Sequence, residues 1–218
     1  MVSSFYRQTL PLRLHSSPAR ILREYICFIN RPTFMIHPDT YVQLTPKGLG
    51  LFAKKRFLRG EILWIIDDID LKMPLLAHQA LDPLQQQKLN IYCYLDYQHR
   101  VIVPWDEGKY VNHSCAPNST GLLEYDNISI ALRTIEPGEE IVEDYYCYYG
   151  HFETFTCKCG APNCRGTIDQ VDSYRPDLRL HLDDIAPDMM KLDQPLLAIQ
   201  SAENTAFLTL LQRYSIPV

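Results

Sequence analysis

Short apolar stretches separated by turn residues dominate the chain and predict a mainly β structure. Apolar and polar side chains alternate over residues 40–45, and residues 48–53 and 61–66 are largely apolar. A Pro-Lys-Gly turn and a Leu-Arg-Gly turn lie between these stretches. Alternation of period two and short apolar runs bounded by turn residues are typical of β-strands.

Further strands are expected downstream of residue 66. Residues 94–103 predict one hairpin, and residues 121–125 with 128–132 predict a second hairpin about Asp126-Asn127. The Pro-Gly turn at 137–138 precedes a strand that should end at Asp144-Tyr145.

Helical signals are short and lie outside these strands. Asp82, Pro83 and Gln85 have the spacing of a capping box, so a helix should begin there and run to about Tyr92. A second helix should begin at Ser201, with four apolar or aromatic residues on one face: Phe207, Leu208, Leu211 and Tyr214. We expect this face to pack against the body of the protein; the alternative is a partner-binding helix.

Composition limits the class of protein. The chain has 218 residues, of which 46% are hydrophobic and 22% charged, as expected for one globular domain with appendages. Its net charge of −5 argues against direct nucleic-acid binding and suits a basic peptide partner. No apolar run reaches the ~20 residues of a membrane span, and no secretory signal is recognised. A monomer without membrane contact is expected.

The N-terminal segment has a distinct composition. Residues 1–23 lack acidic residues and contain four arginines and four serines, which resembles an organellar transit peptide. Pro11 and Pro18 would interrupt a long amphipathic helix. A loosely docked arm is therefore the alternative interpretation.

Seven cysteines are present, and three of them, Cys157, Cys159 and Cys164, fall within eight residues. Without a secretory signal, this spacing favours metal binding in a reducing compartment over disulfides. Structural zinc needs four soft ligands, and the cluster supplies three. Cytoplasm or nucleus is the expected location, with an organelle or secretion as an effector as alternatives. Ordinary buried thiols are expected at Cys27, Cys93 and Cys147.

Four polar or glycine-rich stretches stand out from the strands between them. They are Lys-Gly-Leu-Gly-Leu-Phe-Ala at 47–53, Tyr-Val-Asn-His-Ser-Cys at 110–115, Gly-Glu-Glu-Ile to Asp-Tyr at 138–145, and Cys-x-Cys-x4-Cys at 157–164. The Gly-x-Gly alone is weak and lacks the third glycine of a dinucleotide fingerprint. In this order, the four stretches resemble the SET-domain protein lysine methyltransferases with a post-SET zinc segment.

The resemblance implies a SET-domain fold: small curved sheets, a knot-like threading of the central stretch through a loop formed by the C-terminal strand, and a C-terminal helical extension. It also divides the chain. An N-terminal arm would occupy 1–39, the SET domain 40–150 with an insert at about 67–103, the post-SET zinc segment 151–168, and the helical extension 169–218.

The resemblance also assigns functional residues. Tyr145 corresponds to the catalytic tyrosine, and Cys115 would join Cys157, Cys159 and Cys164 around one structural Zn²⁺. The implied contacts to S-adenosylmethionine are Gly48, Leu49, Gly50, Tyr110, Asn112 and His113. His113 is expected to bind and pack rather than act as the base. The insert would line the substrate cleft, with Tyr92, Tyr94 and Tyr97 as candidate tunnel residues.

Two positions depart from the family pattern. Glu143 stands two residues before the catalytic tyrosine, where an aromatic residue is usual, so the number of methyl groups added is open. Tyr110 stands where the family often has arginine.

The implied function is methyl transfer from S-adenosylmethionine to the ε-amine of a lysine in a protein substrate, histone or non-histone. The alternatives are an inactive zinc-stabilised interaction module of the same fold, and a methyltransferase for a small molecule or another residue type.

Overall fold

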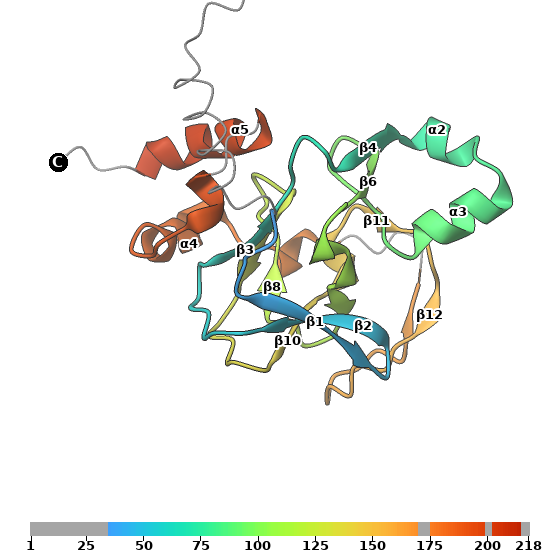
Figure 1. Cartoon of the computed structure of the whole chain (residues 1–218), viewed down its shortest axis with the longest axis horizontal. Coiled ribbons are helices and arrows are strands. Elements are labelled where there is room, and N and C mark those ends of the chain that lie inside the picture. Colours follow the sequence, from blue (N-terminus) through green and yellow to red (C-terminus); the bar gives the residue numbers. More distant parts are fainter. Residues whose placement is uncertain (1–34, 170–174, 199–201, 215–218) are drawn as a thin grey trace, which may run out of the picture. The chain divides into compact units, whose positions relative to one another are not determined.

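The computed structural model describes residues 35–169, 175–198 and 202–214. Three β-sheets and a few short helices make up this part of the chain, which confirms the mainly β prediction (Figure 1). The expected transit segment or arm and Cys27 lie outside the described residues. No helix in the described ranges is both long enough and apolar enough to cross a membrane.

The largest sheet has seven strands in the order β1-β2-β10-β8-β9-β3, and β7 also pairs with β10. The predicted strands at 40–45, 48–53 and 61–66 are found here, the last of them shortened. The bounds are β1 Thr40–Thr45, β2 Gly48–Ala53, β3 Ile62–Ile65, β7 Asn112–His113, β8 Ser119–Thr120, β9 Ile128–Ala131 and β10 Glu140–Glu143.

The central stretch wraps around the end of β10. In the parallel pairings of β10, Glu143 is in register with His113 of β7 and with Ser119 of β8. The Val142 carbonyl accepts the Asn118 N–H at 3.1 Å, and the Glu143 carbonyl accepts the Ser114 N–H at 2.9 Å. Successive carbonyls of a strand point to opposite edges. β10 therefore lies between β7 and β8, an arrangement that the knot-like threading implied by the family resemblance requires.

Asn118 holds this crossing in place. Its side chain is buried, donates to the Glu140 carbonyl at 2.8 Å, and accepts the Val142 N–H at 2.9 Å. One amide side chain thus completes the backbone hydrogen bonds of β10 where a neighbouring strand cannot.

A second sheet has the order β11-β5-β6-β4, and β12 pairs with β13. The predicted hairpin at 94–103 is found as the antiparallel pair β5 and β6. The bounds are β4 Leu71–Pro74, β5 Tyr94–Leu95, β6 Arg100–Val103, β11 Gly150–His151, β12 Phe155–Thr156 and β13 Thr167–Ile168.

Helix α3, Pro83–Asn90, begins as predicted. The Asp82 side chain accepts the Gln85 N–H, and the Gln85 side chain accepts the Asp82 N–H, so both halves of the capping box are present. The helix ends two residues before the expected Tyr92. The remaining helices are α2 Leu75–Gln79, α4 Leu182–Met189, α5 Ala202–Leu211, and the 3-10 helices Glu107–Tyr110, Tyr145–Cys147, Pro176–Leu178, Pro195–Ala198 and Gln212–Tyr214.

The second predicted hairpin is wrong. β9 pairs with β8 at 119–120, and residues 121–125 form no strand beyond a bridge between Leu122 and Leu180. Asp126 and Asn127 are buried rather than exposed in a turn, because Asp126 accepts the Tyr97 N–H and Asn127 accepts the Tyr94 hydroxyl. Polar residues that pair with a distant segment were misread as a solvent-exposed turn.

Helices α4 and α5 complete a core cluster with the large sheet. Phe207 and Leu211 of α5 are buried in a cluster with Ile62 of β3 and Ile130 of β9. This confirms the expected packing of the C-terminal helix. Leu208, assigned to the same face, is 37% exposed instead, because it lies to the side of the buried stripe.

Candidate functional site

A cavity of about 560 Å³ collects residues from segments far apart in the sequence. The central stretch, the end of β10, the end of α3 and residues 152–158 all contribute to its wall. Of the residues predicted for catalysis and cofactor binding, three line it together: Asn112, His113 and Tyr145. The other predicted cofactor contacts, Gly48, Leu49, Gly50 and Tyr110, do not line the cavity.

The Gly-x-Gly stretch contacts a residue of the cavity wall, Asn112. The Asn112 side-chain amide donates to the Leu49 carbonyl at 3.0 Å and to Glu140 Oε1 at 2.8 Å. The other carboxylate oxygen of Glu140 accepts from Lys47 Nζ at 2.7 Å. A Cβ at Gly50 would lie 2.6 Å from Glu140 Oε1 and 3.0 Å from Asn112 Nδ2. Gly50 is therefore required because side chains of the site occupy the space beside it.

Lys47 and Glu140 were not predicted as site residues. Lys47 also lines the cavity, so it presents a cation next to Asn112. Each belongs to one of the four recognised stretches, at 47–53 and 138–145, which was the available signal. Their pairing across 93 residues depends on the antiparallel contact of β10 with β2.

Tyr110 lies at the end of a 3-10 helix next to the cavity. Its ring meets the Tyr92 ring edge-on, with centroids 5.9 Å apart, and Lys109 Nζ lies 5.4 Å from its centroid. Its expected contact with the cofactor stays a prediction.

His113 is buried with both ring nitrogens engaged. Nδ1 accepts the Tyr145 backbone N–H at 3.1 Å, and Nε2 lies 3.4 Å from Cys115 Sγ. Because Nδ1 accepts, the proton of the neutral ring is on Nε2 and faces the sulfur. This geometry gives His113 a positioning role between Tyr145 and the cysteine cluster, and it leaves no ring nitrogen available as a base.

Tyr145 has a fixed hydroxyl. Its OH donates to the Val111 carbonyl at 2.9 Å, and its ring meets those of His113 and Phe155 edge-on at 5.3 and 5.9 Å. Burial, together with the nearby Glu143 carboxylate, raises the pKa of Tyr145 far above its usual range. The hydroxyl is therefore protonated at neutral pH and can orient a reacting group by hydrogen bonding.

Aromatic rings form the inner wall of the cavity. The rings of Tyr94 and Tyr148 pack with their centroids 4.5 Å apart, and the ring centroids of Tyr148 and Tyr145 are 6.4 Å apart. Of the candidate tunnel tyrosines, Tyr92 and Tyr94 line the cavity, and Tyr97 does not. Such a wall suits the aliphatic stem of a lysine.

Glu143 places a carboxylate among these rings. Its side chain is 1% exposed, one oxygen accepts from the Ser129 hydroxyl, and the other accepts from the Tyr148 hydroxyl. Burial raises the pKa of Glu143, and the two hydroxyls and the Arg179 charge only partly offset this rise.

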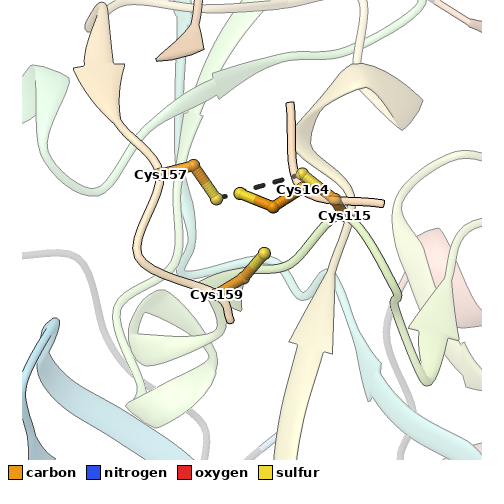
Figure 2. A group of neighbouring side chains, drawn as sticks. All are labelled: Cys115, Cys157, Cys159 and Cys164. Carbon is orange, nitrogen blue, oxygen red and sulfur yellow. Dashed lines mark hydrogen bonds between the residues drawn. The ribbon is translucent and has the colours of Figure 1, made fainter. Parts of the chain in front are cut away.

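The four predicted metal ligands converge next to the cavity (Figure 2). The sulfurs of Cys115, Cys157, Cys159 and Cys164 all lie within 4.8 Å of one another, and Cys115 and Cys157 are 3.9 Å apart. A tetrahedral zinc ion with Zn–S bonds of about 2.3 Å separates its ligands by about 3.8 Å. All four thiols are free, so the donor set fits one such ion.

The surroundings act differently on the cysteines of the cluster: burial raises the pKa of Cys115 and raises that of Cys157 to about 12, whereas the thiolate of Cys159 is favoured. Burial alone would raise the pKa of Cys159, but hydrogen bonds from the backbone of Cys115 and Ala161 and from neighbouring thiols lower it to about 6. The Arg165 N–H also donates to Cys115 Sγ at 3.4 Å. Metal ligands in proteins are commonly held by such hydrogen bonds.

Arg165 connects the cysteine segment to the end of β10. Its guanidinium forms a bidentate ion pair with the buried Asp144 at 2.6 and 2.8 Å, and it stacks 4.3 Å from the Tyr146 ring centroid. Asp144 immediately precedes Tyr145. The cysteine segment therefore fixes the backbone that carries Tyr145, a contribution that the sequence did not reveal.

Comparisons with known proteins agree on one family. The SET-domain family model matches residues 48–146. Histone-lysine N-methyltransferase 2D of Homo sapiens is 30% identical over 129 residues, and the match covers 55% of this chain and 2% of that protein. Histone-lysine N-methyltransferase trr of Drosophila melanogaster is 43% identical over 129 residues, covering 55% and 5%.

A plant relative and a solved structure were also found. A histone H3-lysine(4) N-trimethyltransferase of Arabidopsis thaliana is 28% identical over 140 residues, covering 58% of this chain and 13% of its own length. A crystal structure from Plasmodium falciparum, assigned as a histone methyltransferase, is 22% identical with a TM-score of 0.37 and covers 50% of this chain and 95% of that one. This chain thus spans only a small part of each of the three curated relatives.

Proposed function

We propose that this chain, whose residues 48–146 match the SET-domain family model, is a protein lysine methyltransferase that uses S-adenosylmethionine. One observation carries the proposal: Asn112, His113 and Tyr145, which come from two separate motifs, line a single cavity with aromatic walls. The substrate we propose is a lysine of a protein, since several relatives are named histone-lysine methyltransferases.

The cavity has groups that fit the cofactor. The Lys47 ammonium is a donor for the carboxylate of its amino-acid end, and the Asn112 side-chain oxygen is an acceptor for the ammonium at the same end. The Phe155 ring offers an aromatic face for the adenine. When bound, S-adenosylmethionine supplies a methyl group on a sulfonium, which is an electrophile for an amine. Asn112 would hold the polar end, in an orientation fixed by Leu49 and Glu140.

Residues of the cavity would then align the lysine amine with the methyl group. The stacked Tyr94 and Tyr148 rings would enclose the lysine stem and disfavour its charged form, because an apolar environment lowers the pKa of an amine. The Tyr145 hydroxyl, fixed by the Val111 carbonyl, would orient the amine toward the methyl carbon. Alignment of this kind supplies a large part of the rate in bimolecular transfer.

The four cysteines would hold one Zn²⁺, which contributes folding free energy rather than chemistry. Through His113 and Arg165, this centre would stabilise the chain at Asp144 and at the N–H of Tyr145. Free cysteines at this density suit a reducing compartment, so we place the protein in the cytoplasm or nucleus.

Transfer from labelled S-adenosylmethionine to mixed histones and a whole-cell lysate tests the proposal, with Tyr145→Phe as the matched variant. Wild type should label protein, and Tyr145→Phe should lose at least 100-fold in rate while it binds cofactor with unchanged affinity in a calorimetric titration. Full activity of Tyr145→Phe would refute the role of this hydroxyl. Wild type that neither transfers label nor binds cofactor would instead support an inactive zinc-stabilised module.

A further inference from the structure

Methyl transfer to lysine needs a proton acceptor, because a free lysine amine has a pKa near ~10.4 and is protonated at neutral pH. The two residues nearest to the reaction do not supply one. Tyr145 donates its hydroxyl proton to Val111, and burial keeps that hydroxyl protonated. His113 has both ring nitrogens engaged away from the cavity, by the Tyr145 N–H and by Cys115.

Two carboxylates lie among the described residues that line the cavity, Glu143 and Glu153. Glu153 is exposed to solvent. Glu143 is 1% exposed and belongs to the aromatic inner wall next to Tyr145 and Tyr148. Because Asp144 between them is extended, Glu143 and Tyr145 project to the same side of the chain.

We infer that Glu143 is the group that binds the ε-ammonium of the substrate lysine and accepts its proton before methyl transfer. The inference rests on the proposed function of the cavity. The ammonium gives one proton to the Glu143 carboxylate, and the freed lone pair forms the N–C bond as the C–S bond breaks and its electron pair leaves with sulfur. Glu143 then returns the proton to solvent once the product leaves.

The surroundings of Glu143 suit this role. The Ser129 and Tyr148 hydroxyls each donate to one carboxylate oxygen, which fixes the group without neutralising it and leaves lone pairs for an ammonium. Proton transfer is most efficient when the two pKa values are close. Burial raises the pKa of Glu143, and the same environment would lower that of the amine.

Other charged or titratable groups also face Glu143 from the elements around it. They are Tyr94 of β5, Tyr145 and Cys147 of the 3-10 helix after β10, Tyr148, and Arg179. Burial raises the pKa of the three tyrosines and of Cys147, so these groups stay neutral across the pH range of the test. The pH dependence between neutral pH and pH 10 is therefore that of Glu143 and the substrate amine.

Glu143→Gln tests the inference in the same transfer assay with labelled S-adenosylmethionine and mixed histones. The variant preserves shape but cannot accept a proton, so kcat at pH 7.5 should fall about 100-fold or more. The remaining rate should rise about tenfold per pH unit toward pH 10, as the free amine becomes available. In wild type, the rate should be nearly flat in this range and fall at acidic pH, where Glu143 becomes protonated.

Glu61→Gln is the matched control, because Glu61 is also a buried glutamate but does not line the cavity. Its carboxylate accepts hydrogen bonds from the Leu58 N–H and from Lys55. It should keep the wild-type rate and pH profile. Glu143→Gln with the wild-type rate and profile would overturn the inference and leave the proposed function intact. So would an unchanged rate with a changed number of methyl groups, which would give Glu143 a role in product choice alone.

A second readout does not depend on turnover. Addition of n-butylamine, a mimic of the lysine side chain, at neutral pH should produce the infrared band of a protonated carboxyl in wild type. This band should be absent from Glu143→Gln and present in Glu61→Gln. If the band appears equally in all three proteins, the proton does not reach Glu143 and the inference fails.

Discussion

Gly50 shows how a single residue shapes the site from outside the cavity. The two side chains that occupy the space of its missing Cβ, Glu140 and Asn112, are those that connect the glycine stretch to the cavity. Gly50→Ala should push the Glu140 carboxylate away and leave the Asn112 amide without its fixed orientation. We expect affinity for S-adenosylmethionine to fall about tenfold, the value of one well-formed hydrogen bond, with little change in melting temperature.

Calorimetric titration of S-adenosylmethionine measures this effect. Leu44→Ala on the neighbouring strand is the control, because Leu44 is 74% exposed and should leave affinity unchanged. Equal affinity of Gly50→Ala and wild type would show that the Glu140–Asn112 contact does not position the cofactor.

For single residues, the sequence predicted which residues belong to the site better than it predicted the contacts that they make. Asn112, His113 and Tyr145 were found through motifs and do share one cavity. The contact of Gly50 with cofactor stays a prediction, and the structure adds that Glu140 and Asn112 occupy the space where its Cβ would lie. The ion pair of Arg165 with Asp144 spans 21 residues, and that of Lys47 with Glu140 spans 93, so neither leaves a local pattern to read.

At the scale of elements, the cysteine segment is a separate unit whose order should depend on metal. Cys159→Ser removes one of four ligands and should release zinc, because a three-ligand structural site binds far more weakly. Purified wild type should contain one zinc ion per chain, and the variant should contain none by elemental analysis. Since His113 and Arg165 connect this segment to Tyr145, transfer activity should be lost with the metal.

Cys93→Ser is the control for this experiment, because Cys93 is a buried thiol outside the four-cysteine group. It should retain zinc. Reduced wild type without any zinc would rule out the metal centre, whatever the activity.

Elements with their own local signals were predicted well, and those defined by distant contacts were not. The capping box alone fixes the start of α3, and alternation fixes β1. The strand expected at 121–125 is absent, because Asp126 and Asn127 pair with Tyr97 and Tyr94 of another sheet. The dipeptide Asp126-Asn127 is compatible with an exposed turn and with a buried pair of hydrogen-bonding side chains. Only the contacts made in the folded protein distinguish the two.

For the molecule as a whole, the C-terminal helices are part of the structure that carries the site. Phe207 of α5 is fully buried, and its ring centroid lies 5.2 Å from that of Tyr125. Both belong to the cluster that also contains residues of β3 and β9. Phe207→Ala should lower the free energy of unfolding by about 3–5 kcal/mol, the usual cost of emptying such a site.

Leu208→Ala, one residue away on the exposed side of α5, should cost less than about 1 kcal/mol. Urea unfolding, followed by circular dichroism and by tryptophan fluorescence, measures the change in the free energy of unfolding for Phe207→Ala and for Leu208→Ala. The two tryptophans, Trp64 on β3 and Trp105 after β6, report on the β-sheets, so coincident transitions would show that α5 and the sheets unfold together. Loss of helix signal at a urea concentration that leaves the tryptophan fluorescence unchanged would contradict this.

The central claim is that the cavity transfers a methyl group to lysine under the control of Tyr145. The most direct test is mass spectrometry of mixed histones after reaction with S-adenosylmethionine that carries a deuterated methyl group. We predict the heavy methyl on the ε-amine of lysine with wild type, and its absence with Tyr145→Phe. A heavy methyl on another residue type, or on lysine equally with both proteins, would contradict the claim.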